Sequence, residues 1–360
     1  MHLPYSSMPP LPTSLQDGLL YALQTAFRYH TEDWLPLRLN GLTLGFVNEV
    51  WRKHLIQDWP NLLHEDSDGL HLFTDNWREM GRQLEQLARR WHDAGLFGGW
   101  RNERFDVWSA DGRQILFALE RSAFRPLGLY SHAVHINGLV VTEEGLRFWI
   151  ARRSPHKAVD PNKLDTLVGG GISAGEQIWE AAKREGREEA GLTDAVLNRL
   201  QYTGRCISLH QVSRGLHREC LHIFDVILPN EVIPQNQDGE VASFTLMSAE
   251  EAALAMCNGE MMNDSVLVTA DLFHRLGMLD YGHPLVAYLQ AARHSTDLIG
   301  RPSENMFSDG LDIDGSAYQS IVRRISRRAF CQSDGLIPNL VSRREQSIML
   351  YAGRGAGRGY

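Results

Sequence analysis

The sequence contains few of the features that mark secreted, membrane or fibrous proteins. Its four cysteines, Cys206, Cys220, Cys257 and Cys331, are widely spaced and form no Cys-x-x-Cys pair. This spacing gives no basis for a disulfide framework, so we expect reduced, buried thiols. Residues 1–12 lack the basic region and apolar stretch of a signal peptide, and no window approaches the roughly 18 apolar residues of a membrane span. We therefore expect a cytoplasmic protein that makes no membrane contact.

Positive charge is scarce over most of the chain. The net charge is -8, yet residues 316–360 contain eight arginines against Asp334 and Glu345 and so carry a local charge of +6. Residues 1–315 then carry -14, which argues against general nucleic-acid binding because phosphate contacts need concentrated Lys and Arg. The polar and basic tail, 295–360, is expected to be flexible. A basic helix over residues 321–328 that touches nucleic acid or a membrane surface is the alternative.

Apolar periodicity predicts a small α+β domain over residues 1–128. Two amphipathic helices are expected, over residues 13–30 and 75–94, because their large apolar side chains recur at helical spacing. Two short strands are expected at residues 105–107 and 115–119, where apolar and other side chains alternate. Asp111-Gly112 stands between them and favours a tight hairpin turn.

The pattern changes near residue 129 and predicts a second, α/β domain over residues 129–294. Alternation of strands with helices favours a mixed sheet flanked by helices. The expected strands are 132–142, 146–152, 205–209, 221–228 and 242–246. The expected helices are 177–190, 248–257 and 265–276.

The helix over residues 177–190 concentrates negative charge on one side. At about 100° per residue, Glu185, Glu188 and Glu189 fall within an arc of roughly 100°. Such crowding is unfavourable unless cations lie nearby, and carboxylate oxygens suit a hard ion such as Mg²⁺, which binds phosphates as well. A solvated face is the better interpretation of any single pair, such as Glu180 with Arg184, but it does not account for the whole pattern.

The adjoining side of this helix is suited to packing. Trp179, Ala182, Gly186 and Ala190 lie on an adjoining arc and could hold the helix on the sheet. Gly186 is expected to weaken the helix, because glycine inside a helix costs about 1 kcal/mol relative to alanine.

The segment as a whole resembles the Nudix box. In chain order, that pattern consists of a glycine, five residues, Glu, seven residues, Arg-Glu, an aliphatic residue, any residue, Glu-Glu, any residue, Gly and an aliphatic residue. Gly186 departs from the pattern, which prefers an aliphatic side chain there. The resemblance implies a Nudix α/β/α sandwich with a mixed sheet, preceded by the small α+β domain. The matching residues are Gly170, Glu176, Arg184, Glu185, Glu188, Glu189, Gly191 and Leu192.

The resemblance also implies roles for the residues of the box. Glu185, Glu188 and Glu189 would hold Mg²⁺, or Mn²⁺ as the alternative, with help from the Gly169 carbonyl. Arg184 would orient the carboxylates, whereas Gly170, Glu176 and Gly191 would have structural roles. Either Glu185 or an outside carboxylate, for which Glu240 is the candidate, would activate water. A lone Glu after a turn is equally compatible with a solvated side chain.

Three further stretches, 124–140, 149–171 and 234–244, resemble a subgroup of Nudix proteins related to thiamine pyrophosphokinase, and the similarity spans residues 10–292. Members of that subgroup carry an additional N-terminal domain. The resemblance implies a diphosphatase that converts thiamine diphosphate, or its oxo and oxy forms, to the monophosphate and phosphate. Its substrate would be a small-molecule diphosphate.

Basic residues ahead of the glycine loop are candidates for binding the phosphates. Arg152, Arg153 and Lys157 lead into that loop, and arginine presents donors matched to phosphate oxygens. His135 is a candidate substrate contact, although a histidine in an apolar strand is more often a hydrogen-bonded core residue. Surface solvation remains an alternative for each of the basic residues taken singly.

Other functions are compatible with parts of the pattern. The diphosphate substrate could be ADP-ribose, NADH or another nucleoside diphosphate derivative, because the fold does not choose the substrate. A diphosphate isomerase is disfavoured, since no cysteine precedes the box. A non-catalytic module that binds a nucleotide or thiamine is disfavoured by the intact acidic pairs. A homodimer is left open.

Overall fold

The computed structural model describes residues 8–28, 30–59, 61–109 and 114–294, all within one unit that extends to residue 313. The expected turn at Asp111-Gly112, the tail from residue 295 and Cys331 lie outside the described residues. No helix in the described ranges is long and apolar enough to cross a membrane.

The N-terminal part contains a mixed four-stranded sheet that the apolar periodicity did not predict. Its strand order is β2-β1-β4-β3, with β1 parallel to β4 and the other pairs antiparallel. An antiparallel hairpin, β5 with β6, follows where the sequence predicts one. The strands are β1 (Leu35–Leu39), β2 (Leu42–Val47), β3 (Leu63–Asp66), β4 (Gly69–Leu72), β5 (Arg104–Trp108) and β6 (Ile115–Glu120). The helices are α1 (Thr13–Ala26), η1 (Thr31–Asp33), α2 (Glu49–Asp58), α3 (Trp77–Asp93) and η2 (Arg121–Ala123).

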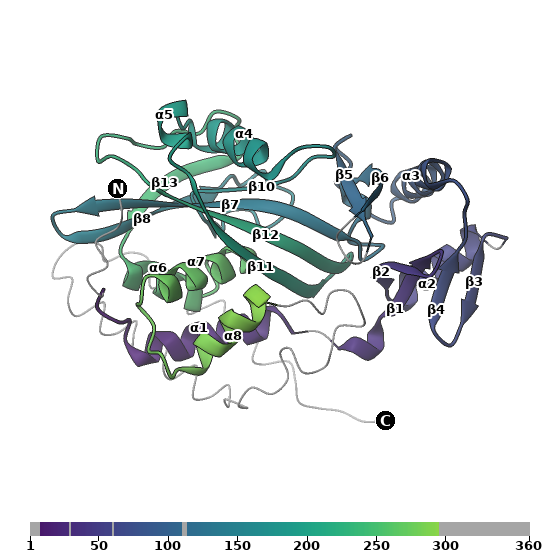
Figure 1. Ribbon diagram of the computed structural model, residues 1–360, viewed down its shortest axis with the longest axis horizontal. Helices are drawn as coiled ribbons and strands as arrows, with labels where there is room; N and C mark the ends of the chain where they lie inside the picture. Colours follow the sequence, from purple (N-terminus) through teal and green to yellow (C-terminus); the bar gives the residue numbers. More distant parts are fainter. Residues whose placement is uncertain (1–7, 29, 60, 110–113, 295–360) are drawn as a thin grey trace, which may run out of the picture. The chain divides into compact units, whose positions relative to one another are not determined.

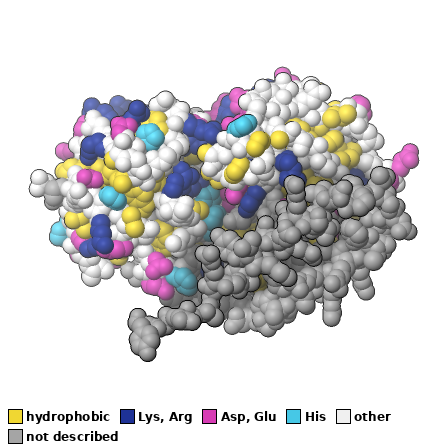
Figure 2. Space-filling model, turned by 180° about the vertical axis from the view of Figure 1, so that it is seen from behind, with side chains coloured by type: hydrophobic (Ala, Val, Ile, Leu, Met, Phe, Trp, Pro, Cys, Tyr) yellow, Lys and Arg dark blue, Asp and Glu magenta, His cyan; other side chains and the backbone are white. Residues whose placement is uncertain are grey.

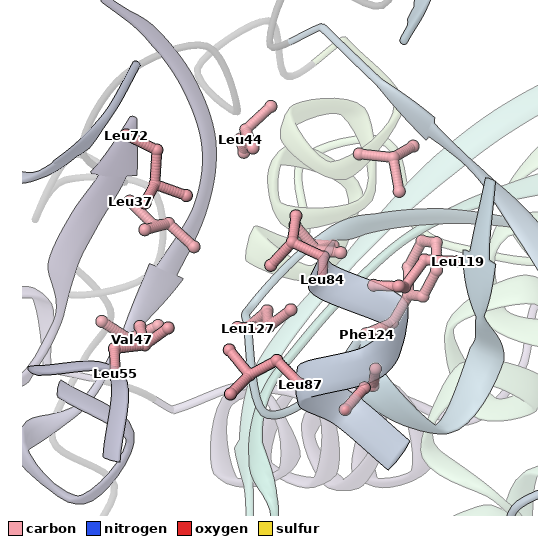
Figure 3. Close-up of a cluster of buried hydrophobic side chains, with 14 of the residues drawn as sticks. Leu37, Leu44, Val47, Leu55, Leu72, Leu84, Leu87, Leu119, Phe124 and Leu127 are labelled. Atoms are coloured by element: carbon pink, nitrogen blue, oxygen red, sulfur yellow. The ribbon is translucent and has the colours of Figure 1, made fainter. Parts of the chain in front are cut away.

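Helix α3 holds this part together. The Asn76 side chain accepts a hydrogen bond from the Glu79 backbone N–H and so caps the helix. Its stripe of Met80, Leu84, Leu87 and Trp91 is buried, as the sequence predicts. Figure 3 shows Leu84 and Leu87 of α3 among side chains from the sheet and from the segment after β6. The apolar face of α3 therefore joins the four-stranded sheet to the β5–β6 hairpin.

The C-terminal part is built on a seven-stranded mixed sheet. The strand order is β11-β12-β7-β8-β13, with β10 paired to β7 and β9 to β8. Strand β12 runs parallel to β7, and the remaining pairs are antiparallel. The predicted strands are confirmed and are longer than expected. The seven strands, of which β9 and β10 were not predicted, are β7 (Tyr130–Thr142), β8 (Gly145–Arg153), β9 (Leu164–Asp165), β10 (Val168–Gly171), β11 (Gln201–Val212), β12 (Gly215–Ile227) and β13 (Val241–Met247).

Helices cover both faces of this sheet, which confirms the predicted Nudix α/β/α sandwich (Figure 1). Helices α4 (Ile178–Ala190) and α5 (Asp194–Leu197) lie on one face. The other face carries α6 (Ala249–Cys257), α7 (Asn263–Arg275) and α8 (Pro284–His294) together with α1 from the start of the chain. Gln16 of α1 donates a hydrogen bond to Asp280 at 2.9 Å, and His283 lies 3.1 Å from Asp17. Helix α1 therefore packs with elements that follow it by more than two hundred residues.

The packing side of α4 differs from the prediction at two positions. Ala182, Gly186 and Ala190 are buried as expected, but Trp179 is 43% exposed, with its ring against Phe224 of the inner strand β12. Gly186 was expected to weaken the packing. A Cβ at that position would lie 2.6 Å from Leu197 Cδ2, so the glycine instead admits the buried Leu197 of α5 close to the helix. Close approach explains why an aliphatic residue is absent there.

Burial keeps several polar side chains of the sheet neutral. Cys206, Cys220 and Cys257 are buried free thiols, in line with the prediction. On the sheet face that carries α4, His132 Nδ1 lies 3.0 Å from His222 Nε2 and the two rings stack. Burial lowers the pKa of His132 to about 4 and that of His222 to about 3. Both imidazoles are therefore uncharged in the folded protein at neutral pH.

This burial predicts a loss of stability in mild acid. Histidines in the unfolded chain take up protons near pH 6.5, whereas His132 and His222 do not until the pH approaches 4. Between those values each histidine lowers the free energy of unfolding by about 1.4 kcal/mol per pH unit of acidification. Urea denaturation at pH 7, 6 and 5 measures the slope. His222→Phe should reduce it by about one proton relative to the exposed replacement His64→Phe. Equal slopes for the two variants would contradict the prediction.

Candidate active site

The glycine strand β10 and the helix α4 form the centre of the site. Strand β10 pairs with β7, and the short loop that follows leads into α4. Glu180 accepts a hydrogen bond from the Gln177 backbone N–H at 3.2 Å and so stabilises the first turn of the helix. The helix ends at Gly191, whose φ of 61° is the left-handed conformation that favours glycine. The predicted helix is therefore confirmed, with its boundaries set by these two residues.

Two carboxylates of α4 lie against the backbone of β10. A Cβ at Gly170 would be 2.1 Å from Glu185 Cδ, so the absence of a side chain at Gly170 creates the space that Glu185 occupies. One turn later, Glu189 Oε2 accepts a hydrogen bond from the Gly169 N–H at 3.0 Å. Glu188 points outward, and its side chain is 49% exposed. The three glutamates thus share one end of the strand, but at different depths.

Arg184 connects these carboxylates to the loop before the helix. Its guanidinium donates to Glu176 at 2.8 and 2.9 Å, to Glu185 at 2.8 Å and to Glu188 at 3.1 Å. It also donates to the Gly171 carbonyl at 3.3 Å. Arginine suits this position because its rigid planar group presents five donors. The spacing of Glu176, Arg184 and Glu185 in the sequence therefore corresponds to one hydrogen-bonded unit.

Burial makes it unfavourable to keep the carboxylates of this cluster charged. It raises the pKa of Glu185, against the opposing effect of Arg184. Burial and the neighbouring charge of Glu185 also raise the pKa of Glu189. These directions mean that the carboxylates gain stability from any cation that approaches them.

Lys157 supplies such a cation. Its ammonium forms an ion pair with Glu240, which stands just before β13, and lies 3.7 Å from Glu189 Oε1. The Glu240 carbonyl in turn accepts a hydrogen bond from the Ser154 N–H at 2.8 Å, which holds the two loops together. A positive group thus already stands between two of the carboxylates. An all-oxygen donor set around a cation fits a hard divalent ion such as Mg²⁺ or Mn²⁺.

The other candidate residues lie at varying distances from this cluster. Arg153 donates to Asp165 at 2.8 Å and to the Val159 carbonyl at 3.0 Å, and so anchors the loop that carries Lys157. Arg152 donates to the Asn162 carbonyl at 2.7 Å, so the structure does not bring it to the carboxylates. His135 is buried, and its Nδ1 lies 3.0 Å from Thr166 Oγ1. Of the basic candidates, Lys157 is the one in contact with the glutamates.

Two residues of the site were missed by sequence reasoning. Asp165 is the buried partner of Arg153 and also accepts a hydrogen bond from Ser265. Arg101, in the N-terminal part, donates to Glu240 Oε1 at 3.2 Å across 139 residues of sequence. Asp165 lies within the stretch 149–171 that resembles the thiamine-related subgroup, but no role was expected for it, and Arg101 lies in none of the three stretches. Both contacts depend on tertiary structure.

A side chain placed in the space above Gly170 would test whether the cluster binds a divalent ion. Gly170→Ala should displace the Glu185 carboxylate and weaken divalent-ion binding roughly ten- to hundred-fold, the usual effect of disturbing a metal site's surroundings. Titration calorimetry with Mn²⁺ measures this, with thermal unfolding as the check on folding. Gly282→Ala is the matched control, because a Cβ there meets nothing within 4 Å. Equal Mn²⁺ affinity in the two variants would show that the close approach has no consequence for the metal.

Comparison with known proteins agrees with this geometry. Residues 132–264 match the model of the NUDIX domain, and residues 19–131 match that of a domain of unknown function, DUF4743. The chain is 30% identical over 259 residues to Nudix hydrolase 20, chloroplastic, of Arabidopsis thaliana, with 69% of each chain covered. It is 29% identical over 253 residues to Nudix hydrolase 24, chloroplastic, of the same plant, again with 69% of each covered.

A yeast relative shows a similar likeness. The uncharacterized protein YJR142W of Saccharomyces cerevisiae is 30% identical over 234 residues, which covers 60% of this chain and 68% of that protein. The two family models together match residues 19–264, in both parts of the chain. The protein therefore belongs to the Nudix hydrolases, a family of pyrophosphohydrolases that generally use divalent metal ions and act on diphosphate bonds.

Proposed function

We propose that this Nudix hydrolase is a Mg²⁺-dependent diphosphatase that converts thiamine diphosphate, or its oxidised oxo and oxy analogues, to the monophosphate and phosphate. The observation that carries the reaction is the cluster of carboxylates beside the glycine strand, in which Glu185 fills the space above Gly170 and Glu189 and Glu240 lie around the ammonium of Lys157. A diphosphate presents the oxygen atoms that a hard divalent ion binds together with carboxylates. The cluster thus supports hydrolysis at phosphorus.

The residues of α4 would hold the ion. Glu185, Glu188 and Glu189, with the Gly169 carbonyl, provide oxygen ligands at one end of β10. When bound, Mg²⁺ neutralises charge on the phosphate oxygens and makes a bound water more acidic. Arg184 keeps the carboxylates oriented, since it donates to both Glu185 and Glu188. Lys157 offsets the charge of Glu189 and Glu240 and is placed to contact a phosphate.

The two candidates for accepting the water proton differ in their surroundings. Glu185 is buried, and burial raises its pKa, which favours proton uptake. Glu240 is instead occupied by ion pairs with both Lys157 and Arg101. We therefore propose that Glu185 is the general base and that Glu240 holds the two neighbouring cations in place.

The substrate assignment is supported by the positions of the three stretches that resemble the thiamine-related subgroup. They form β7, the segment through the Lys157 loop to β10, and the loop that carries Glu240. All three meet at the carboxylate cluster rather than at separate surfaces. The similarity to that subgroup thus involves the surroundings of the reacting group, which determine specificity in this fold.

Replacement of the buried glutamate tests the reaction. Glu185→Gln should lower kcat by roughly 10²–10⁴-fold, because it removes the proposed base, and Glu188→Gln should also lower it by weakening the ion site. Phosphate release measures the rate, and circular dichroism checks the fold. Glu250→Gln, at an exposed position outside the cluster, is the matched control. Wild-type rates in both test variants would exclude the assignment.

A substrate screen tests the thiamine reading. With Mg²⁺ present, kcat/KM should be highest for thiamine diphosphate or its oxidised analogues, compared with ADP-ribose, NADH and nucleoside triphosphates. Preference for ADP-ribose would replace the substrate but retain the reaction. Phosphate or monophosphate release is the measured quantity in each case.

A further inference from the structure

The N-terminal part of the chain contacts the loop that joins β10 to α4. The Ala174 N–H donates to the Arg104 carbonyl at 2.8 Å, and the Gly175 N–H donates to Asp106 at 2.8 Å. A Cβ at Gly171 would lie 2.4 Å from Phe105 Cζ, so this ring rests on the end of β10. These contacts hold strand β5 against the segment that carries the metal-site carbonyl and the start of the carboxylate helix.

Arg101 lies just before this strand. Its backbone is held by a hydrogen bond, whereas its side chain is accessible to solvent. Its backbone N–H donates to Glu120 at 3.2 Å, and Glu120 is fully buried. Its guanidinium reaches the other domain, where Nη1 donates to Glu240 at 3.2 Å, yet the side chain is 43% exposed. A backbone held in place and a solvent-accessible guanidinium suit a residue that binds a ligand. Figure 2 shows that Lys and Arg side chains are interspersed with acidic and hydrophobic ones over the described part of one face.

Two cations meet at Glu240. Arg101 and Lys157 both contact this carboxylate, and Lys157 also lies beside Glu189. An ion pair as exposed as Arg101 with Glu240 contributes little to folding, so stability does not explain its position. The partly exposed guanidinium of Arg101 therefore lies beside the carboxylate cluster, and its donors match phosphate oxygens.

We propose that Arg101 is a substrate-binding residue and that the N-terminal domain, whose family model is described as of unknown function, supplies it as one wall of the active site. The proposal rests on the proposed function, because its ligand is the diphosphate group of the substrate. The guanidinium presents donors in a planar fork, so it donates to phosphate oxygens while Nη1 remains on Glu240. The hydrolase site is thus assembled from both domains of the chain.

The test separates binding from turnover. Arg101→Ala should raise KM for thiamine diphosphate about ten- to hundred-fold with kcat changed less than about threefold, and should weaken Mg²⁺-dependent binding of imidodiphosphate by a similar factor. Arg101→Lys should fall between, because it keeps the charge without the fork. Arg82→Ala, an exposed residue of α3 in the same domain, is the matched control.

Contrary results have distinct meanings. An unchanged KM with a reduced kcat, as in Glu240→Gln, would overturn the proposal, because Arg101 would then act only by holding Glu240. Equal binding of imidodiphosphate by Arg101→Ala and the wild type would also overturn it. If the wild type hydrolysed no diphosphate, the proposed function would fail, whereas the imidodiphosphate titration would still decide the role of Arg101.

Discussion

Repulsion among closely placed carboxylates is the constraint on which this structure depends. Glu185 and Glu189 lie against the glycine strand β10, where burial disfavours their charged forms. Their ionised forms therefore need cations beside them. Arg184 meets this need from within α4, and Lys157 meets it from a loop between β8 and β9. The carboxylates are thereby held together on one side of α4, with a charge partner for each of the two that are buried.

The same constraint explains why distant parts of the chain meet at one place. Lys157 comes from one loop and Glu240 from another, and Arg101 comes from the preceding domain. Each is held by backbone contacts that have no direct part in chemistry, such as the bond from Ser154 N–H to the Glu240 carbonyl. The hydrophobic core of α3 positions β5, and β5 positions the loop beside Gly171. Packing in the first domain is thereby transmitted to the site in the second.

The spacing of apolar residues was sufficient to predict helices and strands in which it is regular. It could not predict contacts that form only in the tertiary fold. The helix from Ile178 and the long strands β7 and β8 were predictable, because their apolar side chains recur at one period. Strands β1–β4 were not, because they are short and two of them carry exposed or charged residues. Gly186 was misjudged because helix propensity concerns an isolated helix, whereas its role here is to admit Leu197. No spacing in the sequence could have paired Arg101 with Glu240.

The position of α1 has a consequence for the order in which the protein folds during synthesis. Gln16 forms its hydrogen bond with Asp280 across 264 residues, and Leu15, Leu19 and Leu23 are buried. At the usual rates of translation, α1 leaves the ribosome on the order of ten to fifty seconds before the helices that cover it. An amphipathic helix must therefore wait, with its apolar face uncovered, while the intervening domain completes its own core. Elements made more than two hundred residues later therefore close the structure over α1.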